Sequence, residues 1–224
     1  MPSSDKDKDK DKDKDKDKDK DQMKIETVDQ LREVVGHPNP ATEQKKSSGL
    51  TNDAIEFIGK SPLLLLATTS ESGAMDVSPK GDEPGFVQID EQNNLLIPDR
   101  RGNRLVDGHL NILQNPAVGM IFFVPNTRET LRVNGSAELL ADEQLQKAMA
   151  NQNHPAVLIT RVHVRECFFH CGKALIRSRL WQPDTWPDKA RVSFGRQYVE
   201  RSGADEALAE VIDANIELDY KDNL

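Results

Sequence analysis

A short segment rich in hydrogen-bond donors separates an apolar, strand-like run from a helix-like run. Its polar members are Arg100, Arg101, Asn103 and Arg104. The first backbone N–H groups of a helix lack partners, the helix dipole adds positive potential there, and guanidinium groups grip phosphate in a bidentate fork. Because the run from Leu105 to Gln114 has a helical pattern, the segment predicts a phosphate-binding loop. The alternative is a loop whose arginines are solvated or paired with Asp99 and Asp107.

A second cluster combines basic side chains with an aromatic ring. It consists of Lys173, Arg177, Arg179 and Trp181. A Trp ring can stack on a flat ligand while Lys and Arg neutralise an anion, so the cluster predicts a ligand that carries both features. The alternative is a core-facing Trp surrounded by solvated basic residues.

The stretch from Leu131 to Leu139 gives the clearest strand signal in the chain. Apolar and polar residues alternate there, which is the period-2 pattern of a half-buried strand. Arg132 lies on the polar face of this strand. We expect it to reach a ligand or a partner subunit, or to pair with Glu129 or Glu138.

The two cysteines, Cys167 and Cys171, flank His170. So small a number argues against a disulfide framework and suits reduced thiols inside a cell. The same residues with His163 could bind a metal, but no second Cys or His pair has zinc-site spacing. We therefore expect partly buried free thiols and no metal.

The first 22 residues differ from the rest of the chain. From Asp5 to Asp21, nine Asp alternate with eight Lys and no apolar residue intervenes. Such a segment cannot bury surface to offset its ordering entropy, so we expect a disordered tail. The formal net charge is −8 for the whole chain. An acidic body argues against nucleic acid as a partner, because Lys and Arg supply most non-specific affinity for phosphate backbones.

Nothing in the sequence predicts a membrane segment. The start Met-Pro-Ser-Ser has no apolar signal core, and the longest apolar run, Leu63 to Ala67, is too short to span a bilayer. We expect a cytoplasmic protein whose partner is a small anionic ligand.

The predicted elements are mostly strands with short helices between them. Strands are expected at 63–69, 74–78, 86–89, 95–97, 117–124, 131–139 and 156–164, and helices at 27–35, 53–58, 105–114, 142–150 and 204–214. The order lacks alternating βαβ units, glycine-rich phosphate loops and a Gly-x-Ser-x-Gly elbow. It predicts a mainly β fold with peripheral helices (α+β), built on an antiparallel barrel.

Four segments in this order resemble the pyridoxamine 5′-phosphate oxidase-like family of split-barrel flavoproteins. They are Asp76–Gly81, Ile97–Arg104, Thr130–Ala137 and Phe169–Trp181. The last of them looks like a subgroup of FMN-binding members. The resemblance implies a six-stranded antiparallel split β-barrel. The expected domains are a tail at 1–22, a helix and linker at 23–50, the FMN-binding split barrel at 51–188 and a helical extension at 189–224.

The resemblance also implies a homodimer with two FMN molecules at the subunit interface, each touched by both chains. It assigns the ribityl phosphate to Arg100, Arg101, Asn103 and Arg104, the edge of the isoalloxazine ring to Met75, Asp76, Val77, Ser78 and Lys80, and an approach from the partner chain to Lys173, Arg177 and Trp181. The C-terminal Arg and His arrangement of the family's best-known oxidase is missing, so oxidation of pyridoxamine phosphate is not expected.

The expected function is that of an FMN-dependent oxidoreductase. A hydride or electron pair would pass between the flavin and an unidentified small-molecule substrate or electron donor, with Lys80 or Lys173 stabilising negative charge on the reduced ring. No catalytic residue is assigned. The alternatives are a non-enzymatic FMN carrier or sensor that uses the same residues, and a split barrel that binds deazaflavin or haem.

Overall fold

The computed structural model describes residues 24–152 and 154–222, so the expected disordered tail lies outside the described residues. The chain divides into two compact units, residues 1–44 and 45–224. The described part of the first holds α2 (Val28–Val35) and α3 (Pro40–Glu43). The predicted capping box of α2 is confirmed, because Thr27 and Gln30 each accept a hydrogen bond from the other's backbone N–H.

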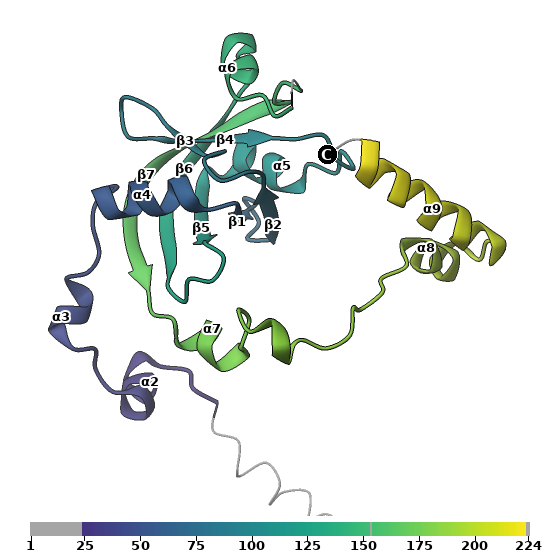
Figure 1. Cartoon of the computed structure of the whole chain (residues 1–224). Helices are drawn as coiled ribbons and strands as arrows, with labels where there is room; N and C mark the ends of the chain where they lie inside the picture. Colours follow the sequence, from purple (N-terminus) through teal and green to yellow (C-terminus); the bar gives the residue numbers. More distant parts are fainter. Residues whose placement is uncertain (1–23, 153, 223–224) are drawn as a thin grey trace, which may run out of the picture. The chain divides into compact units, whose positions relative to one another are not determined.

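The second unit is built on one seven-stranded sheet in which all neighbouring strands are antiparallel (Figure 1). The strand order is β2-β1-β5-β6-β7-β4-β3. The strands are β1 (Leu63–Thr69), β2 (Met75–Gly81), β3 (Gln88–Ile89), β4 (Leu95–Asp99), β5 (Ala117–Phe123), β6 (Thr130–Leu140) and β7 (Leu158–His170). The predicted mainly β split barrel is confirmed, with seven strands in place of six; β3 has only two residues.

The helices of this unit lie between and after the strands. They are α4 (Asn52–Lys60), α5 (Asp107–Gln114), α6 (Glu143–Ala148), α7 (Lys173–Ser178), the 3-10 helix η1 (Pro183–Thr185), α8 (Phe194–Ser202) and α9 (Ala207–Asp222). The sequence analysis missed α3, α7 and α8, and α9 begins and ends later than predicted. Two of the missed helices are short, with four residues in α3 and six in α7, so neither is long enough to show a helical period in the sequence.

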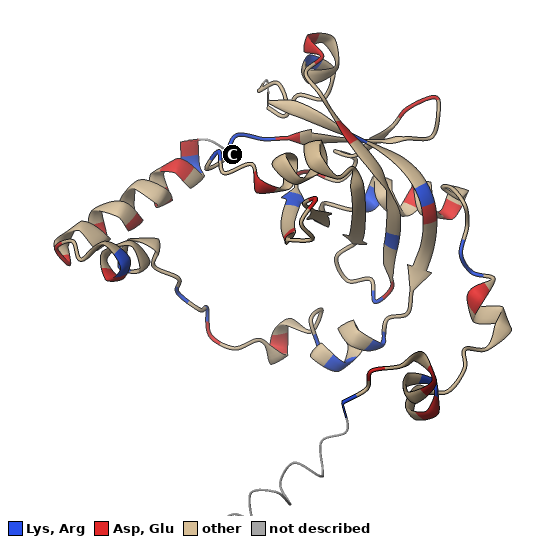
Figure 2. Cartoon of the chain, turned by 180° about the vertical axis from the view of Figure 1, so that it is seen from behind, with Lys and Arg blue, Asp and Glu red and all other residues tan. Residues whose placement is uncertain are grey.

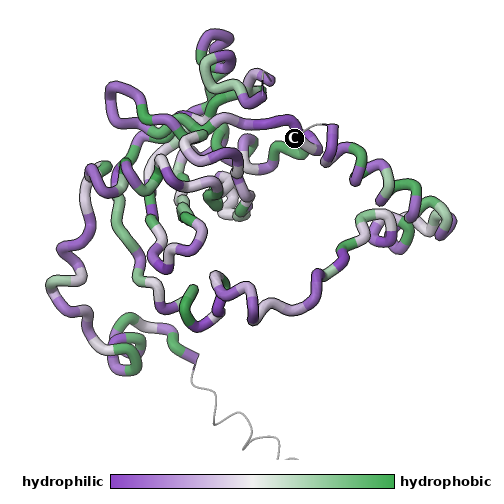
Figure 3. The backbone as a smooth tube through the Cα atoms, in the orientation of Figure 1, coloured by the Kyte–Doolittle hydropathy of each residue, from purple (hydrophilic) through white to green (hydrophobic). Residues whose placement is uncertain are grey.

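The core lies between the sheet and the helix α4, which crosses it (Figure 1). Alternate residues of β1 and β5 are buried, as the period of a strand requires. Ala54 and Ile58 of α4 and Ile112 of α5 join the same core. Hydrophobic residues accordingly follow the strands in Figure 3, whereas the connection from α7 to α8 is mostly hydrophilic.

Two strands extend further than the sequence indicated. The edge strand β2 continues through Pro79 to Gly81, where a loop was expected. Proline is tolerated there because an edge strand has one side on which no ladder hydrogen bond is needed. The strand β7 continues to His170 and pairs with β6 across a bulge at Asn134 and Gly135. A Cβ atom on Gly135 would overlap the carbonyl of His163, so the bulge requires glycine.

No helix within the described residues is long and apolar enough to cross a membrane. The predicted domain boundaries at 22, 50 and 188 remain predictions.

Candidate functional site

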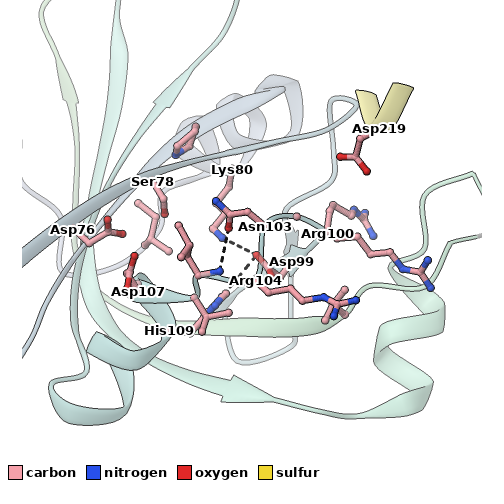
Figure 4. A pocket seen from close by; sticks show the side chains of 18 residues that line it. Asp76, Ser78, Lys80, Asp99, Arg100, Asn103, Arg104, Asp107, His109 and Asp219 are labelled. Carbon is pink, nitrogen blue, oxygen red and sulfur yellow. Dashed lines mark hydrogen bonds and ion pairs between the residues drawn. The ribbon is translucent and has the colours of Figure 1, made fainter. Parts of the chain in front are cut away.

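A pocket of about 950 Å³ lies between β2, the segment after β4 and the start of α5 (Figure 4). Its volume lies within the range of about 300–1,000 Å³ that is typical of small-molecule sites. It is lined by Leu66, Asp76, Ser78, Pro79, Lys80, the continuous run Asp99–His109, Val157 and Asp219. The pocket therefore brings together two segments that the sequence analysis had assigned to one ligand.

Seven of the twelve predicted site residues line this pocket. They are Asp76, Ser78, Lys80, Arg100, Arg101, Asn103 and Arg104. Met75 and Val77 do not line it, because successive side chains of β2 point to opposite faces of the sheet. They are 69% and 58% exposed.

The predicted basic–aromatic cluster lies elsewhere in the chain. Lys173 and Arg177 are exposed on α7, and Trp181 follows that helix. The Trp181 indole Nε1 donates a hydrogen bond to the carbonyl of Thr127 at 2.8 Å. None of the three lines the pocket of their own chain. Their expected approach to a ligand from the partner chain remains a prediction.

The residues Arg100–Arg104 form the arginine loop, and the segment that joins β4 to α5 is one of the blue stretches in Figure 2. Arg100 is held by the protein itself. Its Nε donates to Asp82 Oδ2 at 2.7 Å, and its Nη1 donates to the carbonyl of Met149 at 2.8 Å. The predicted alternative of pairing with Asp99 or Asp107 is therefore wrong for Arg100, whose carboxylate partner is Asp82.

Arg101 and Arg104 differ from Arg100 in that both are exposed. Neither makes an ion pair or a side-chain hydrogen bond within residues 24–152 and 154–222. Asn103 is partly occupied, because its Oδ1 accepts a hydrogen bond from the backbone N–H of Leu105. The arginine loop thus offers two guanidinium groups whose donors are available to a ligand.

The helix α5 begins two residues later than predicted, after a strained turn. Arg104 and Val106 have φ angles of 62° and 50°. Left-handed backbone is unusual for a β-branched residue such as Val106 and costs on the order of 1–3 kcal/mol per residue. Val106 also provides no side-chain acceptor for the first N–H groups of α5. An uncapped helix start on a strained turn is a common setting for a ligand site.

The start of α5 sits close to β1 and β2 because Gly108 has no side chain. A Cβ atom there would lie 3.2 Å from Asp76 Oδ2 and 3.6 Å from Thr68 Oγ1. One turn later, Asn111 Nδ2 donates to Thr68 Oγ1 at 3.1 Å. These contacts hold α5 against the sheet and so place His109 at the pocket wall.

A polar cluster at this wall links three elements. Lys80 Nζ of β2 contacts Asp99 Oδ1 of β4 at 2.6 Å, and His109 Nε2 of α5 lies 3.7 Å from the same oxygen. All three side chains are largely buried. The pKa of His109 lies below its ordinary value of 6.5, chiefly because burial disfavours the charged ring; Asp99 opposes this shift and Lys80 adds to it.

The sequence analysis did not identify His109 as a site residue. A single histidine near the start of a helix is an ordinary residue in sequence. Only its distance from Asp99, a residue ten positions earlier in the chain, shows its relation to the site.

The other predicted polar positions have different surroundings. Cys167 is buried, which raises the pKa of its thiol to about 11, whereas Cys171 is exposed. No group of three His, Cys, Asp or Glu side chains in the described part of the chain could hold a metal ion. The Arg132 guanidinium lies 5.1 Å from the centre of the Phe168 ring. Its predicted partners Glu129 and Glu138 form ion pairs with Arg128 and Arg161, respectively.

The family model described as pyridoxamine 5′-phosphate oxidase matches residues 50–171, more than half of the chain. The chain belongs to the pyridoxamine 5′-phosphate oxidase family. The match spans β2, the arginine loop and α5, so most of the pocket lies inside the family region. The resemblance inferred from the four sequence segments is confirmed.

Several solved structures are similar to part of this chain. A HupZ variant from Group A Streptococcus has 16% identity and a TM-score of 0.44, with 54% of this chain and 98% of that chain covered. A proposed pyridoxamine 5′-phosphate oxidase from Lactobacillus delbrueckii has 22% identity and a TM-score of 0.43, covering 55% and 98%. A pyridoxamine 5′-phosphate oxidase-related, FMN binding protein from Nostoc punctiforme has 16% identity and a TM-score of 0.36, covering 47% and 72%. A comparison with the curated proteins found no match.

Proposed function

We propose that this member of the pyridoxamine 5′-phosphate oxidase family binds FMN and acts as an oxidoreductase on a small molecule. The observation that carries the proposal is the composition of the pocket. Arg101 and Arg104 pair with no described residue and offer their guanidinium groups beside the start of α5, and the polar residues of β2 line another wall. A phosphate and a polar ring edge would each find partners there.

The residues present fit FMN on chemical grounds. Its phosphate carries about two negative charges at neutral pH. The N–H groups at the start of α5 and the two arginines that pair with no described residue match that charge. Asp76, Ser78 and Lys80 share one face of β2 and would hold the ring and ribityl groups. When bound, FMN supplies the hydride or electron transfer, and the protein binds, orients and shields it.

The first test is the absorption spectrum of the purified protein. We expect a yellow protein whose flavin bands disappear on reduction, and uptake of added FMN by any protein purified without it. A colourless protein that takes up no FMN would contradict the proposal. A deazaflavin or haem spectrum would show instead that the barrel binds one of these two alternative ligands. Turnover with NADH or NADPH and an acceptor would separate an enzyme from a carrier or sensor.

We also propose that the chain forms a homodimer through an apolar face of the sheet. The register places Val77, Ala67 and Gly119 side by side on neighbouring strands. Partly exposed Leu65 and Ile121 continue the same face. Contiguous exposed apolar surface marks an interaction site in soluble proteins.

A charge in the centre of this face should separate the two subunits. We expect Val77→Glu to convert a dimer of about twice the 25.1 kDa chain mass into a monomer, because a carboxylate loses far more on burial than a Val side chain. Light scattering after size-exclusion chromatography measures the mass. The matched control is Val35→Glu on α2, where the Val is 68% exposed. A Val77→Glu protein that stays dimeric would place the interface elsewhere.

A further inference from the structure

His109 is a buried polar side chain to which no described residue makes a hydrogen bond. The residue is 8% exposed, and neither ring nitrogen has a hydrogen-bond partner among the described residues. A buried donor or acceptor that is left unpaired costs about 1–3 kcal/mol. The ring nevertheless lines the pocket and points toward Asp99 (Figure 4). A buried group with an unmet hydrogen-bonding capacity next to a ligand pocket needs an explanation in terms of function.

The carboxylate of Asp99 lies between the Lys80 ammonium group and the His109 ring. Lys80 Nζ is in hydrogen-bond contact with Oδ1 at 2.6 Å, whereas His109 Nε2 is 3.7 Å from the same oxygen. That gap is too long for a hydrogen bond. Asp99 therefore pairs with Lys80, and His109 lies beside this ion pair with no hydrogen bond to it.

Lys80 itself faces the pocket, and Asp99 is the partner that the structure gives it. An anion that enters the pocket competes with Asp99 for the ammonium group. When Lys80 turns to the anion, the Asp99 carboxylate loses its ion-pair partner. His109 can replace Lys80 as that partner, because it can take up a proton and donate a hydrogen bond from Nε2 to the Asp99 carboxylate.

We propose that binding of an anionic ligand in this pocket is coupled to the uptake of one proton by His109, as Asp99 exchanges its ion pair with Lys80 for one with His109. The proton comes from solvent, and no bond other than N–H is formed. The inference rests on the proposed function in one respect, because FMN is the anionic ligand used to test it.

The charges around His109 favour this exchange. Asp99 of β4 and Lys80 of β2 are the charged groups that act on the ring. The other charged residues that line the same pocket are Asp76 of β2, Arg100, Arg101 and Arg104 of the arginine loop, Asp107 of α5 and Asp219 of α9. Burial holds the pKa of His109 below its ordinary value, and the charge of Lys80 adds to this effect. A bound anion and an unpaired Asp99 would both raise it.

The expected pH dependence follows from this direction. His109 is neutral in the ligand-free protein above its lowered pKa, and protonated in the complex below the raised one. Proton uptake is therefore greatest between these two pKa values. The FMN affinity should rise as the pH falls through that window, and it should level off on either side.

The decisive measurement is calorimetric titration with FMN in two buffers of different ionisation enthalpy, at several pH values between 6 and 8. The dependence of the binding heat on the buffer gives the number of protons taken up. The phosphate of FMN also titrates near pH 6, so the wild-type chain is compared with His109→Gln, which has no titratable ring. We expect the wild type to take up as much as one proton more per FMN than the variant.

A second measurement follows the His109 ring by NMR in the ligand-free chain. Replacing Lys80 by Met leaves Asp99 without its ion pair, so we expect the pKa of His109 to rise by at least about one unit. An unchanged pKa would overturn the exchange at Asp99, whether or not any ligand binds.

The outcomes also separate this inference from the proposed function. If FMN binds and the wild type and His109→Gln take up equal numbers of protons, the inference fails and the FMN assignment stands. If FMN does not bind, the same titration with inorganic phosphate decides whether the pocket binds anions with proton uptake. If neither binds, both proposals fail.

Discussion

Replacement of Arg101 and Arg104 by Ala is expected to weaken FMN binding by a factor of about 10² to 10⁴, and to leave riboflavin binding nearly unchanged. Both side chains are exposed and line the pocket. Each charge-assisted hydrogen bond to a phosphate contributes about 1.5–3 kcal/mol, and riboflavin has no phosphate with which to make it. Quenching of flavin fluorescence, measured with each ligand in turn, gives the two dissociation constants.

This pair of ligands makes the result specific to the phosphate. A variant that loses FMN and riboflavin equally would show that the two arginines support the loop and do not contact the phosphate. Because the side chains of Arg101 and Arg104 make no hydrogen bond or ion pair with other described residues, unfolding free energies should stay close to the wild-type value. A matched control is Arg191→Ala, an exposed arginine that does not line the pocket.

Replacement of Arg100 by Ala should instead destabilise the fold, by about 2–4 kcal/mol in the free energy of unfolding. The reason is its partner: the side chain of Asp82 is only 5% exposed, and the substitution leaves that carboxylate without its cation. The hydrogen bond from Arg100 to the Met149 carbonyl is lost as well. Urea unfolding followed by circular dichroism measures the loss.

The double variant Arg100→Ala with Asp82→Asn tests the cause. An Asn side chain carries no charge, so the double variant should recover part of the stability that Arg100→Ala loses. Asp82 Oδ1 also accepts hydrogen bonds from Asn151 and from the Glu83 backbone, so the recovery should be incomplete. Stability unchanged by Arg100→Ala, together with weaker FMN binding, would return Arg100 to the phosphate-binding group.

The sequence was sufficient for the fold class because the relevant signals are local. Alternating side chains in β6 and the apolar run of β1 predicted strands at the observed places. The capping box of α2 marked the start of that helix. Two of the elements that were missed, α3 and α7, are only four and six residues long and are too short to show a helical period. The strand β2 was predicted too short because Pro79 indicates a turn, and its tolerance depends on the place of β2 at the edge of the sheet.

The sequence also predicted which residues line the candidate site. The arginine loop and the polar residues of β2 were identified by their chemistry, and the tertiary structure places most of them around one pocket. The sequence did not distinguish the three arginines of that loop from one another. They are equivalent as residues, and only the fold pairs Arg100 with Asp82, a residue 18 positions away, while Arg101 and Arg104 stay exposed.

The relation among Lys80, Asp99 and His109 was decided by tertiary structure alone. The three residues lie on different elements. Their spacing in the sequence does not indicate that Lys80 Nζ and His109 Nε2 lie 2.6 and 3.7 Å from Asp99 Oδ1. Burial, which shifts the pKa of His109, is likewise a property of packed neighbours. The chain by itself specifies a β fold with a loop suited to phosphate. Folding decides which of its charges are already paired and which remain for a ligand.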